Sequence, residues 1–126
     1  MSEKKPVIMV ADDEEDIKSV LEMFLEAAGY DVVSAYDGLD AIEKIRESKP
    51  DLVLMDIMMP LIDGIEVVRQ MKADDAIKDI PVIMLTAAAK SDMVDKAIQA
   101  GAVDYIQKPF EPEQVQGVIE KTLMSK

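Results

Sequence analysis

The sequence contains neither cysteine nor histidine among its 126 residues. A disulfide framework is therefore impossible, and a zinc site would have to be built from carboxylates alone, which leaves hard, oxygen-preferring cations as the metals to consider. Long apolar runs are absent as well: none approaches the roughly 20 residues of a membrane helix, and the start of the chain lacks the pattern of a signal peptide. These absences predict a cytoplasmic protein without a membrane partner.

Positive charge is also scarce, since 14 basic residues stand against 26 acidic ones and give a net charge of −12. This balance opposes binding to polyanions, so we expect no direct nucleic-acid partner. Hydrophobic residues make up 49% of the chain, which argues against disorder. At 13.9 kDa the chain has the size of one domain, which we expect to span residues 1–126.

Five apolar segments alternate with five helical patterns. The apolar segments cover residues 7–10, 31–35, 52–55, 81–86 and 103–107. The first helical stripe runs from Ile17 through Val20 to Ala28 and is closed by Gly29. Asp63 can cap the third helix. The alternation predicts βαβ units, and hence an α/β fold with a mainly parallel sheet and helices on both faces.

Polar side chains stand where four of these predicted strands end. They are Asp12 with Asp13, Asp56, Thr86 and Lys108. In a parallel sheet the carboxyl ends share one edge, where ligands of open α/β proteins bind. Each residue has an ordinary explanation on its own, because aspartates cap helices and turns, threonine suits a strand and lysine is a common surface charge. Their joint placement favours a functional site.

The chemistry of these side chains points to a divalent cation and a phosphate. Crowded carboxylates repel one another unless a cation lies among them, and this crowding predicts that removing Asp12 or Asp13 stabilises the metal-free fold. Mg²⁺ is the natural candidate, because it is typically held by one or two carboxylates together with a phosphate oxygen. Lys108 offers a positive charge for the phosphate, and the Thr86 hydroxyl offers a hydrogen bond. Asp56 is the best placed to be a phosphoryl-accepting nucleophile.

Four motifs together carry a family resemblance that covers essentially the whole chain. They are Val10-Ala-Asp12-Asp13-Glu14, Met55-Asp56-Ile-Met-Met-Pro60 with Asp63-Gly64, Leu85-Thr86-Ala87, and Asp104-Tyr105-Ile-Gln-Lys108-Pro109-Phe110. In this order and spacing they resemble the receiver domain of bacterial response regulators. The resemblance implies a flavodoxin-like (βα)5 fold whose five parallel strands lie in the order 2-1-3-4-5.

The resemblance also implies roles for the residues of the site. Asp56 resembles the phosphoacceptor. Asp13, Asp56 and the backbone carbonyl of Met58 resemble direct Mg²⁺ ligands, with Asp12 acting directly or through water. Lys108 would hold the phosphoryl oxygen, and its bond to the following proline is expected to be cis.

The resemblance also implies that a pair of switch residues transmits the signal from the site to the surface. Thr86 and Tyr105 resemble the hydroxyl and the aromatic side chain that move together on phosphorylation. The face of helix four, strand five and helix five would then present the signal, as a monomer or a weak phosphorylation-dependent dimer, to a downstream effector protein. The residues expected on or near that face are Lys90, Asp92, Asp95, Lys96 and Gln99, which an ordinary solvated helix surface would explain equally well.

The implied function is that of a phosphorelay switch in a two-component system. Because the chain has no histidine, the phosphoryl group must come from a sensor histidine kinase, a histidine phosphotransfer protein or a small phosphodonor. The domain would catalyse only its own phosphorylation and dephosphorylation. Met58 and Ala88 bring no polar group to the site, which leaves the lifetime of the phosphate open.

The sequence also allows other interpretations of the function and of the extent of the protein. We expect a stand-alone receiver, because the chain stops right after the last helix and that helix lacks arginines resembling a dimer interface. The alternative is a receiver excised from a transcription factor or hybrid kinase. A phosphatase with an aspartyl nucleophile, similar to haloacid dehalogenases, would have a second aspartate where this chain has Met58. Nucleotide binding is poorly supported, because the five glycines form neither a P-loop nor a dinucleotide fingerprint.

Overall fold

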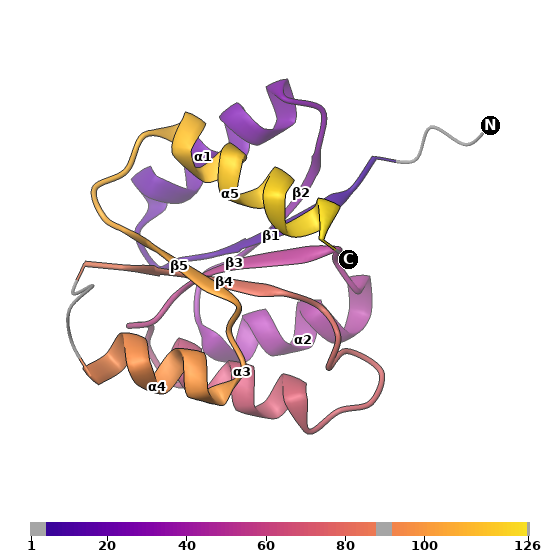
Figure 1. Ribbon diagram of the computed structural model, residues 1–126, viewed down its shortest axis with the longest axis vertical. Helices are drawn as coiled ribbons and strands as arrows, with labels where there is room; N and C mark the ends of the chain where they lie inside the picture. The colour runs from indigo at the N-terminus through magenta and orange to yellow at the C-terminus, as the bar shows by residue number, and fades with distance from the viewer. Residues whose placement is uncertain (1–4, 88–91, 126) are drawn as a thin grey trace.

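The apolar segments of the sequence form strands in the structure, and the amphipathic segments form helices (Figure 1). The computed structural model describes residues 5–87 and 92–125. The elements in chain order are β1 (Val7–Ala11), α1 (Glu15–Ala27), β2 (Asp31–Ala35), α2 (Gly38–Ser48), β3 (Leu52–Asp56), α3 (Gly64–Lys72), β4 (Val82–Thr86), α4 (Asp92–Ala100), β5 (Asp104–Gln107) and α5 (Pro112–Met124).

All four strand pairings are parallel, and the order across the sheet is β2-β1-β3-β4-β5. This order confirms the flavodoxin-like fold that the resemblance implies. The chain leaves β1 to one side to form β2 and then crosses to the other side to form β3. The carboxyl ends of β1 and β3 therefore border the crevice where the direction of winding reverses, which is where open α/β sheets bind ligands.

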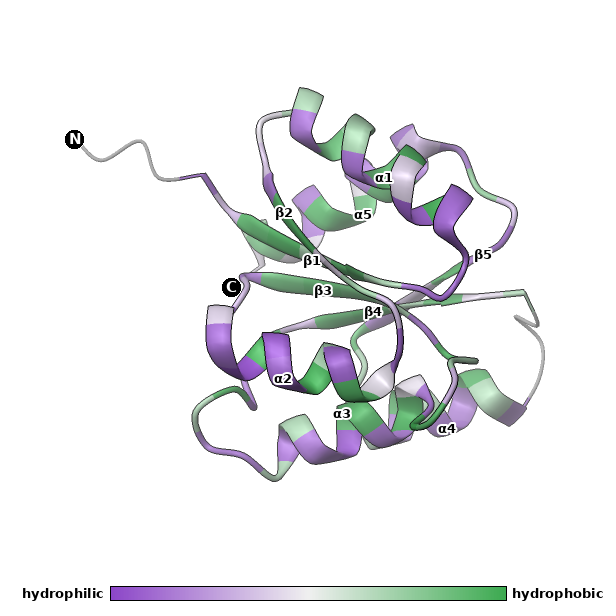
Figure 2. Ribbon diagram, turned by 180° about the vertical axis from the view of Figure 1, so that it is seen from behind, coloured by the Kyte–Doolittle hydropathy of each residue, from purple (hydrophilic) through white to green (hydrophobic). Residues whose placement is uncertain are grey.

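Hydrophobic cores lie on both faces of the sheet, because successive residues of each strand point to opposite sides. Figure 1 shows α1 and α5 over one face and α2, α3 and α4 over the other. Figure 2 shows the apolar character concentrated in the strands and on the inward sides of the helices. On the α1 and α5 side the core includes Ile8, Val10, Leu21, Leu25, Leu52, Leu54, Ile83, Leu85, Val115 and Ile119. On the opposite side it includes Met9, Ile42, Ile45, Val53, Met55, Ile65, Val68, Met71, Val82 and Met84.

The ends of the helices follow the signals in the sequence. Gly29 adopts a φ of 102° just after α1, a conformation that glycine reaches without steric cost. Asp63 caps α3 by accepting a hydrogen bond from the backbone N–H of Glu66 at 2.9 Å. Asp37 caps α2 in the same way, through the N–H of Asp40 at 2.8 Å. The loops between strands and helices at the carboxyl edge are thereby fixed by side chains.

The predicted stripe of α1 is wrong at two positions, because Val20 and Ala28 are both exposed. Val20 is 53% exposed, whereas Lys18, outside the stripe, is only 6% exposed. The stem of Lys18 is covered while its ammonium group reaches Glu15 at 2.9 Å and lies 6.0 Å from the ring of Tyr36. The apolar stripe is wider than the strip of α1 that the sheet covers. Within the described ranges, no helix has the length and apolar character needed to span a membrane.

Candidate functional site

Three aspartates meet at the crevice between the ends of β1 and β3. Asp12 and Asp13 follow the last residue of β1, and Asp56 is the last residue of β3. One carboxylate oxygen of each lies within 4.8 Å of the other two. Asp12 is fully buried, Asp56 is 7% exposed and Asp13 is exposed. The sheet thus sets two buried acids behind a third that faces solvent.

Asp12 is fixed by the backbone on both sides of it. Its N–H donates to the carbonyl of Ala35, and its Oδ1 accepts from the N–H of Glu14 at 2.9 Å. Its Oδ2 lies 3.0 Å from Nζ of Lys108, but the geometry is that of an ion pair, and this buried oxygen has no hydrogen-bond partner among the described residues. A buried polar atom without a partner is costly. A cation at this position would remove that cost.

Lys108 brings a positive charge into the cluster. Its Nζ lies 3.0 Å from Asp12, 2.9 Å from Glu14 and 3.1 Å from Asp56, and its side chain is 11% exposed. Burial alone would lower the pKa of Lys108, but the interactions with Glu14, Asp12 and Asp56 outweigh burial and raise that pKa above its usual value. The ammonium group therefore stays protonated.

The position of Lys108 is set by the backbone of the two last strands. Lys108 follows β5, and its N–H donates to the carbonyl of Thr86 at the end of β4, at 2.8 Å. The peptide bond between Lys108 and Pro109 is cis, as the resemblance implies. The long side chain then reaches across the end of β4 to the acids at β1 and β3.

Asp56 is a desolvated carboxylate held by two donors. Its Oδ1 accepts from the N–H of Met58 at 3.1 Å, and its Oδ2 accepts from Lys108 at 3.1 Å. Burial raises the pKa of Asp56, Lys108 opposes that rise, and the charge of Asp12 adds to it. The carboxylate therefore has a fixed orientation beside a permanent positive charge.

The donor set of this cluster fits a hard divalent cation. The acids offer oxygen atoms alone, which are the ligands that Mg²⁺ prefers. Asp12 Oδ2 lacks a hydrogen-bond donor among the described residues. The four nearby carboxylates of Asp12, Asp13, Glu14 and Asp56 outnumber the single ammonium of Lys108. An excess of negative charge remains for a cation to balance.

Thr86 and Tyr105 lie on the two strands nearest to Lys108. Thr86 is the last residue of β4 and is 4% exposed, whereas Tyr105 is 41% exposed on the edge strand β5. In the register of these strands, Tyr105 pairs with Met84. Asp92, Asp95, Lys96 and Gln99 are exposed on α4. Ala88 and Lys90 lie outside the described residues.

Sequence reasoning gave no role to Glu14, which the structure joins to Lys108. The available signal was a third acid directly after the aspartate pair. The contact itself could not be predicted from spacing, because 94 positions separate the two residues and the bond depends on how Lys108 crosses β4.

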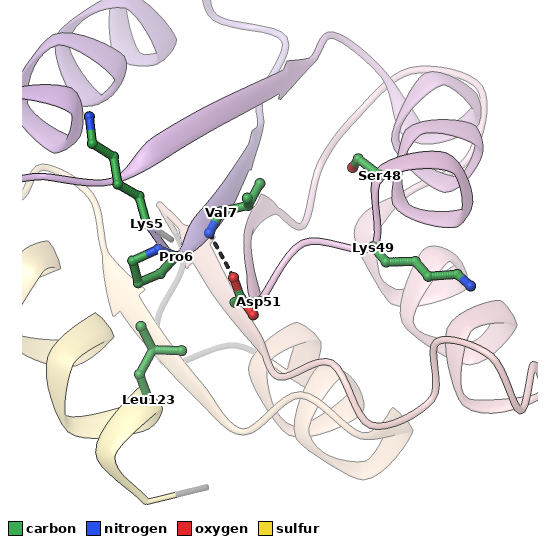
Figure 3. Close-up of a pocket in the computed structure, with 7 residues that line it drawn as sticks. All are labelled: Lys5, Pro6, Val7, Ser48, Lys49, Asp51 and Leu123. Atoms are coloured by element: carbon green, nitrogen blue, oxygen red, sulfur yellow. Dashed lines mark hydrogen bonds between the residues drawn. The ribbon is translucent and has the colours of Figure 1, made fainter. Parts of the chain in front are cut away.

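A different hollow, of about 430 Å³, opens at the opposite edge of the sheet (Figure 3). Its acid, Asp51, already accepts a hydrogen bond from the N–H of Val7 at 2.7 Å. Figure 3 shows the side chains of Lys5 and Lys49 extending away from Asp51 and in different directions. Charged groups do not converge on this hollow, so the carboxyl edge is the better candidate for a site.

Comparison with known sequences gives a consistent result. The response regulator receiver domain family matches residues 8–120. The alkaline phosphatase synthesis transcriptional regulatory protein PhoP of Bacillus subtilis is 42% identical over 118 residues, which cover 92% of this chain and 48% of that protein. The chain spans about half the length of the curated relatives it matches.

Solved structures agree with the sequence relatives. The chemotaxis response regulator CheY4 of Vibrio cholerae is 27% identical with a TM-score of 0.89, covering 94% of this chain and 98% of that one. The receiver domain of the sensor histidine kinase PA1611 of Pseudomonas aeruginosa, with a magnesium ion in its active site cleft, is 29% identical with a TM-score of 0.88, covering 95% and 98%. The chain belongs to the response regulator receiver domain family, the signalling domains of two-component systems.

Proposed function

We propose that this chain is a phosphorylation switch in which Asp56 accepts the phosphoryl group. One observation carries the proposal: the buried Asp56 carboxylate lies within 4.8 Å of the carboxylates of Asp12 and Asp13 and 3.1 Å from the ammonium of Lys108. Phosphoryl transfer depends mainly on positioning and on neutralising charge. A fixed carboxylate beside a lysine and a cation-binding cluster supplies both.

In the proposed reaction an oxygen of Asp56 forms a bond to phosphorus while the P–N bond of a phosphohistidine breaks, and the histidine leaves with a proton from solvent. The phosphohistidine belongs to a sensor kinase or a phosphotransfer protein, because this chain contains no histidine. The N–H of Met58 holds one Asp56 oxygen and orients the carboxylate. Lys108 binds a phosphoryl oxygen, and the Thr86 hydroxyl donates a hydrogen bond to another.

Asp12, Asp13, Asp56 and the backbone carbonyl of Met58 would hold Mg²⁺, with Asp12 acting directly or through water. When bound, the ion neutralises charge on the phosphoryl oxygens. The buried Asp12 oxygen without a hydrogen-bond partner supports this assignment. Hydrolysis of the phosphoaspartate at the same site resets the switch, and the domain turns over no other substrate.

The proposed output is a change at the face of α4, β5 and α5. Thr86 would follow the phosphoryl group, and the half-exposed Tyr105 would move into the space that it leaves. A phosphate-biased equilibrium between two conformations suffices for such an output. The partner that recognises this face is a protein rather than a nucleic acid, since the net charge of −12 repels a polyanion.

We further propose that residues 1–126 act as one receiver domain in the cytoplasm, as a monomer or a weak dimer when phosphorylated. The curated relatives are transcriptional regulators about twice as long, so the stand-alone form remains a prediction. The intact mass of the natural gene product tests it directly. A mass well above 13.9 kDa would favour the alternative of a larger regulator.

The central experiment is labelling with acetyl phosphate. We expect Mg²⁺-dependent addition of one phosphoryl group, measured by intact mass, and its loss in Asp56→Asn. Asp75→Asn is the matched control, because Asp75 is a 96% exposed aspartate outside the cluster. Labelling that persists in Asp56→Asn would refute the proposal, and so would steady turnover of phosphomonoesters by the wild-type protein.

A further inference from the structure

The ammonium group of Lys108 is surrounded by carboxylates, donating hydrogen bonds to Glu14 and Asp56 and forming an ion pair with Asp12. It carries three N–H groups. Three carboxylates lie within reach of them, those of Asp12 at 3.0 Å, Glu14 at 2.9 Å and Asp56 at 3.1 Å. A phosphoryl oxygen that binds Lys108 must therefore compete with these carboxylates for the ammonium group.

The three carboxylates differ in how easily they can leave. The Asp12 side chain is fully buried and that of Asp56 is 9% exposed, whereas that of Glu14 is 58% exposed. Separating a buried carboxylate from its cation leaves an uncompensated charge, but an exposed carboxylate regains water. Glu14 and Lys108 both line a hollow of about 550 Å³ between α1 and the loop before α5, so Glu14 has open space to move into.

The side chain of Glu14 is also not needed to hold the start of α1 together. Glu14 occupies the N-cap position of α1, but its side chain makes no capping hydrogen bond. Its own N–H is held by Asp12, and its carbonyl accepts from the N–H of Lys18. The side chain can therefore leave Lys108 without breaking the first turn of the helix.

We propose that Glu14 is a positioning residue that competes with the phosphoryl group for Lys108. In the unphosphorylated state its carboxylate accepts a hydrogen bond from the ammonium at 2.9 Å, and on phosphorylation it moves away into the hollow. It thereby lowers the affinity of the site for a phosphoryl group, both by occupying the lysine and by repelling the incoming charge. This inference rests on the proposed role of Asp56.

The test compares Glu14→Gln with Glu15→Gln. Both substitutions remove one negative charge at the start of α1, but Glu15 is paired with Lys18 rather than Lys108. The probe is beryllofluoride, a mimic of the phosphoryl group, titrated calorimetrically at saturating Mg²⁺. We expect Glu14→Gln to bind it about two- to fivefold more tightly than the wild type, the range of a partly exposed ion pair, and Glu15→Gln to match the wild type.

Two further measurements separate competition from a structural effect. Glu14→Ser, which cannot reach Lys108 but is a good N-cap, should show the same gain and guards against misfolding of the glutamine variant. The difference in beryllofluoride affinity between the wild type and Glu14→Gln should become smaller at high KCl, because the salt screens the wild-type ion pair. Equal affinities in Glu14→Gln and Glu15→Gln, or weaker binding in Glu14→Gln, would overturn the inference. No binding by the wild type would instead count against the role of Asp56.

Discussion

Replacement of Gly64 by alanine probes how closely α3 is packed against the end of β3 that carries Asp56. A Cβ at Gly64 would lie 2.5 Å from the carbonyl oxygen of Asp56, 2.8 Å from Cε of Met84 and 3.1 Å from Cα of Ile57. The methyl group of Met84 can move aside. The other two atoms belong to the backbone at the end of the central strand, and the N–H of Gly64 is itself bonded to the carbonyl of Ile57 at 2.8 Å. The helix and the strand must therefore separate.

The size of the effect follows from this geometry. Overpacking of a well-packed interior costs about 1–3 kcal/mol, and contact with backbone rather than a flexible side chain places Gly64→Ala toward the upper end. Loss of the extra chain entropy of glycine returns about 0.4–1 kcal/mol. We expect a net loss of roughly 2 kcal/mol, which for a domain of this size lowers Tm by roughly 6–10 °C.

The matched control is Gly117→Ala in α5. Apart from its chain neighbours and the backbone of its own helix, no atom lies within 4 Å of a Cβ at Gly117, so alanine should raise the free energy of unfolding by about 0.5–1 kcal/mol through helix propensity. Urea unfolding followed by circular dichroism in EDTA measures both variants. We also expect Gly64→Ala to bind Mg²⁺ more weakly, because the backbone of Asp56 shifts. A Gly64→Ala protein as stable as the wild type would show that the strand end yields freely and would refute the reasoning.

Three smaller predictions concern other positions. In EDTA, the free energy of unfolding of Asp12→Ala should be about 1–3 kcal/mol lower than that of the wild type, because the buried cluster loses a hydrogen-bonded carboxylate. Asp13→Ala should unfold at the same urea concentration as the wild type or at a higher one. Leu61→Gly should be about 0.5–1 kcal/mol more stable than Leu61→Ala, because φ is 72° there, and equal urea midpoints would contradict this. The hydrogen bond from Ala76 and the pairing with Arg46 lower the pKa of Asp74. The ionised carboxylate therefore stabilises the fold above about pH 4, and this stabilisation is lost in stronger acid. The free energy of unfolding of Asp74→Asn should approach that of the wild type as the pH falls.

The first of these predictions refines what the sequence suggests about the acids. Crowding alone predicts that removal of either Asp12 or Asp13 stabilises the metal-free protein. The structure separates the two, because Asp12 receives the N–H of Glu14 and lies beside Lys108, whereas Asp13 faces solvent. The counter-charge comes from the far end of the chain, and pairwise repulsion between neighbours could not reveal it.

The strands and their shared edge were predictable because parallel strands buried on both faces need uninterrupted apolar residues. Asp56 at the end of β3 and Thr86 at the end of β4 follow from that rule alone. The exposure of Val20 does not, because periodicity defines the apolar side of α1 but not how much of it α5 and the sheet cover. The contact of the Lys18 ammonium with the ring of Tyr36 likewise depends on a residue of another loop, which periodicity within α1 cannot reveal.

We expect phosphorylation to change the partners of Lys108 because of the charge of the site. A phosphoryl group on Asp56 would add nearly two negative charges to a cluster that already holds more carboxylates than ammonium groups. This group would compete for the ammonium of Lys108 with the carboxylates that already surround it. The backbone N–H of Lys108 is bonded to the carbonyl of Thr86, which joins the lysine to the end of β4. We therefore expect the phosphoryl group to replace the exposed Glu14 contact and to leave the buried contact with Asp12 in place.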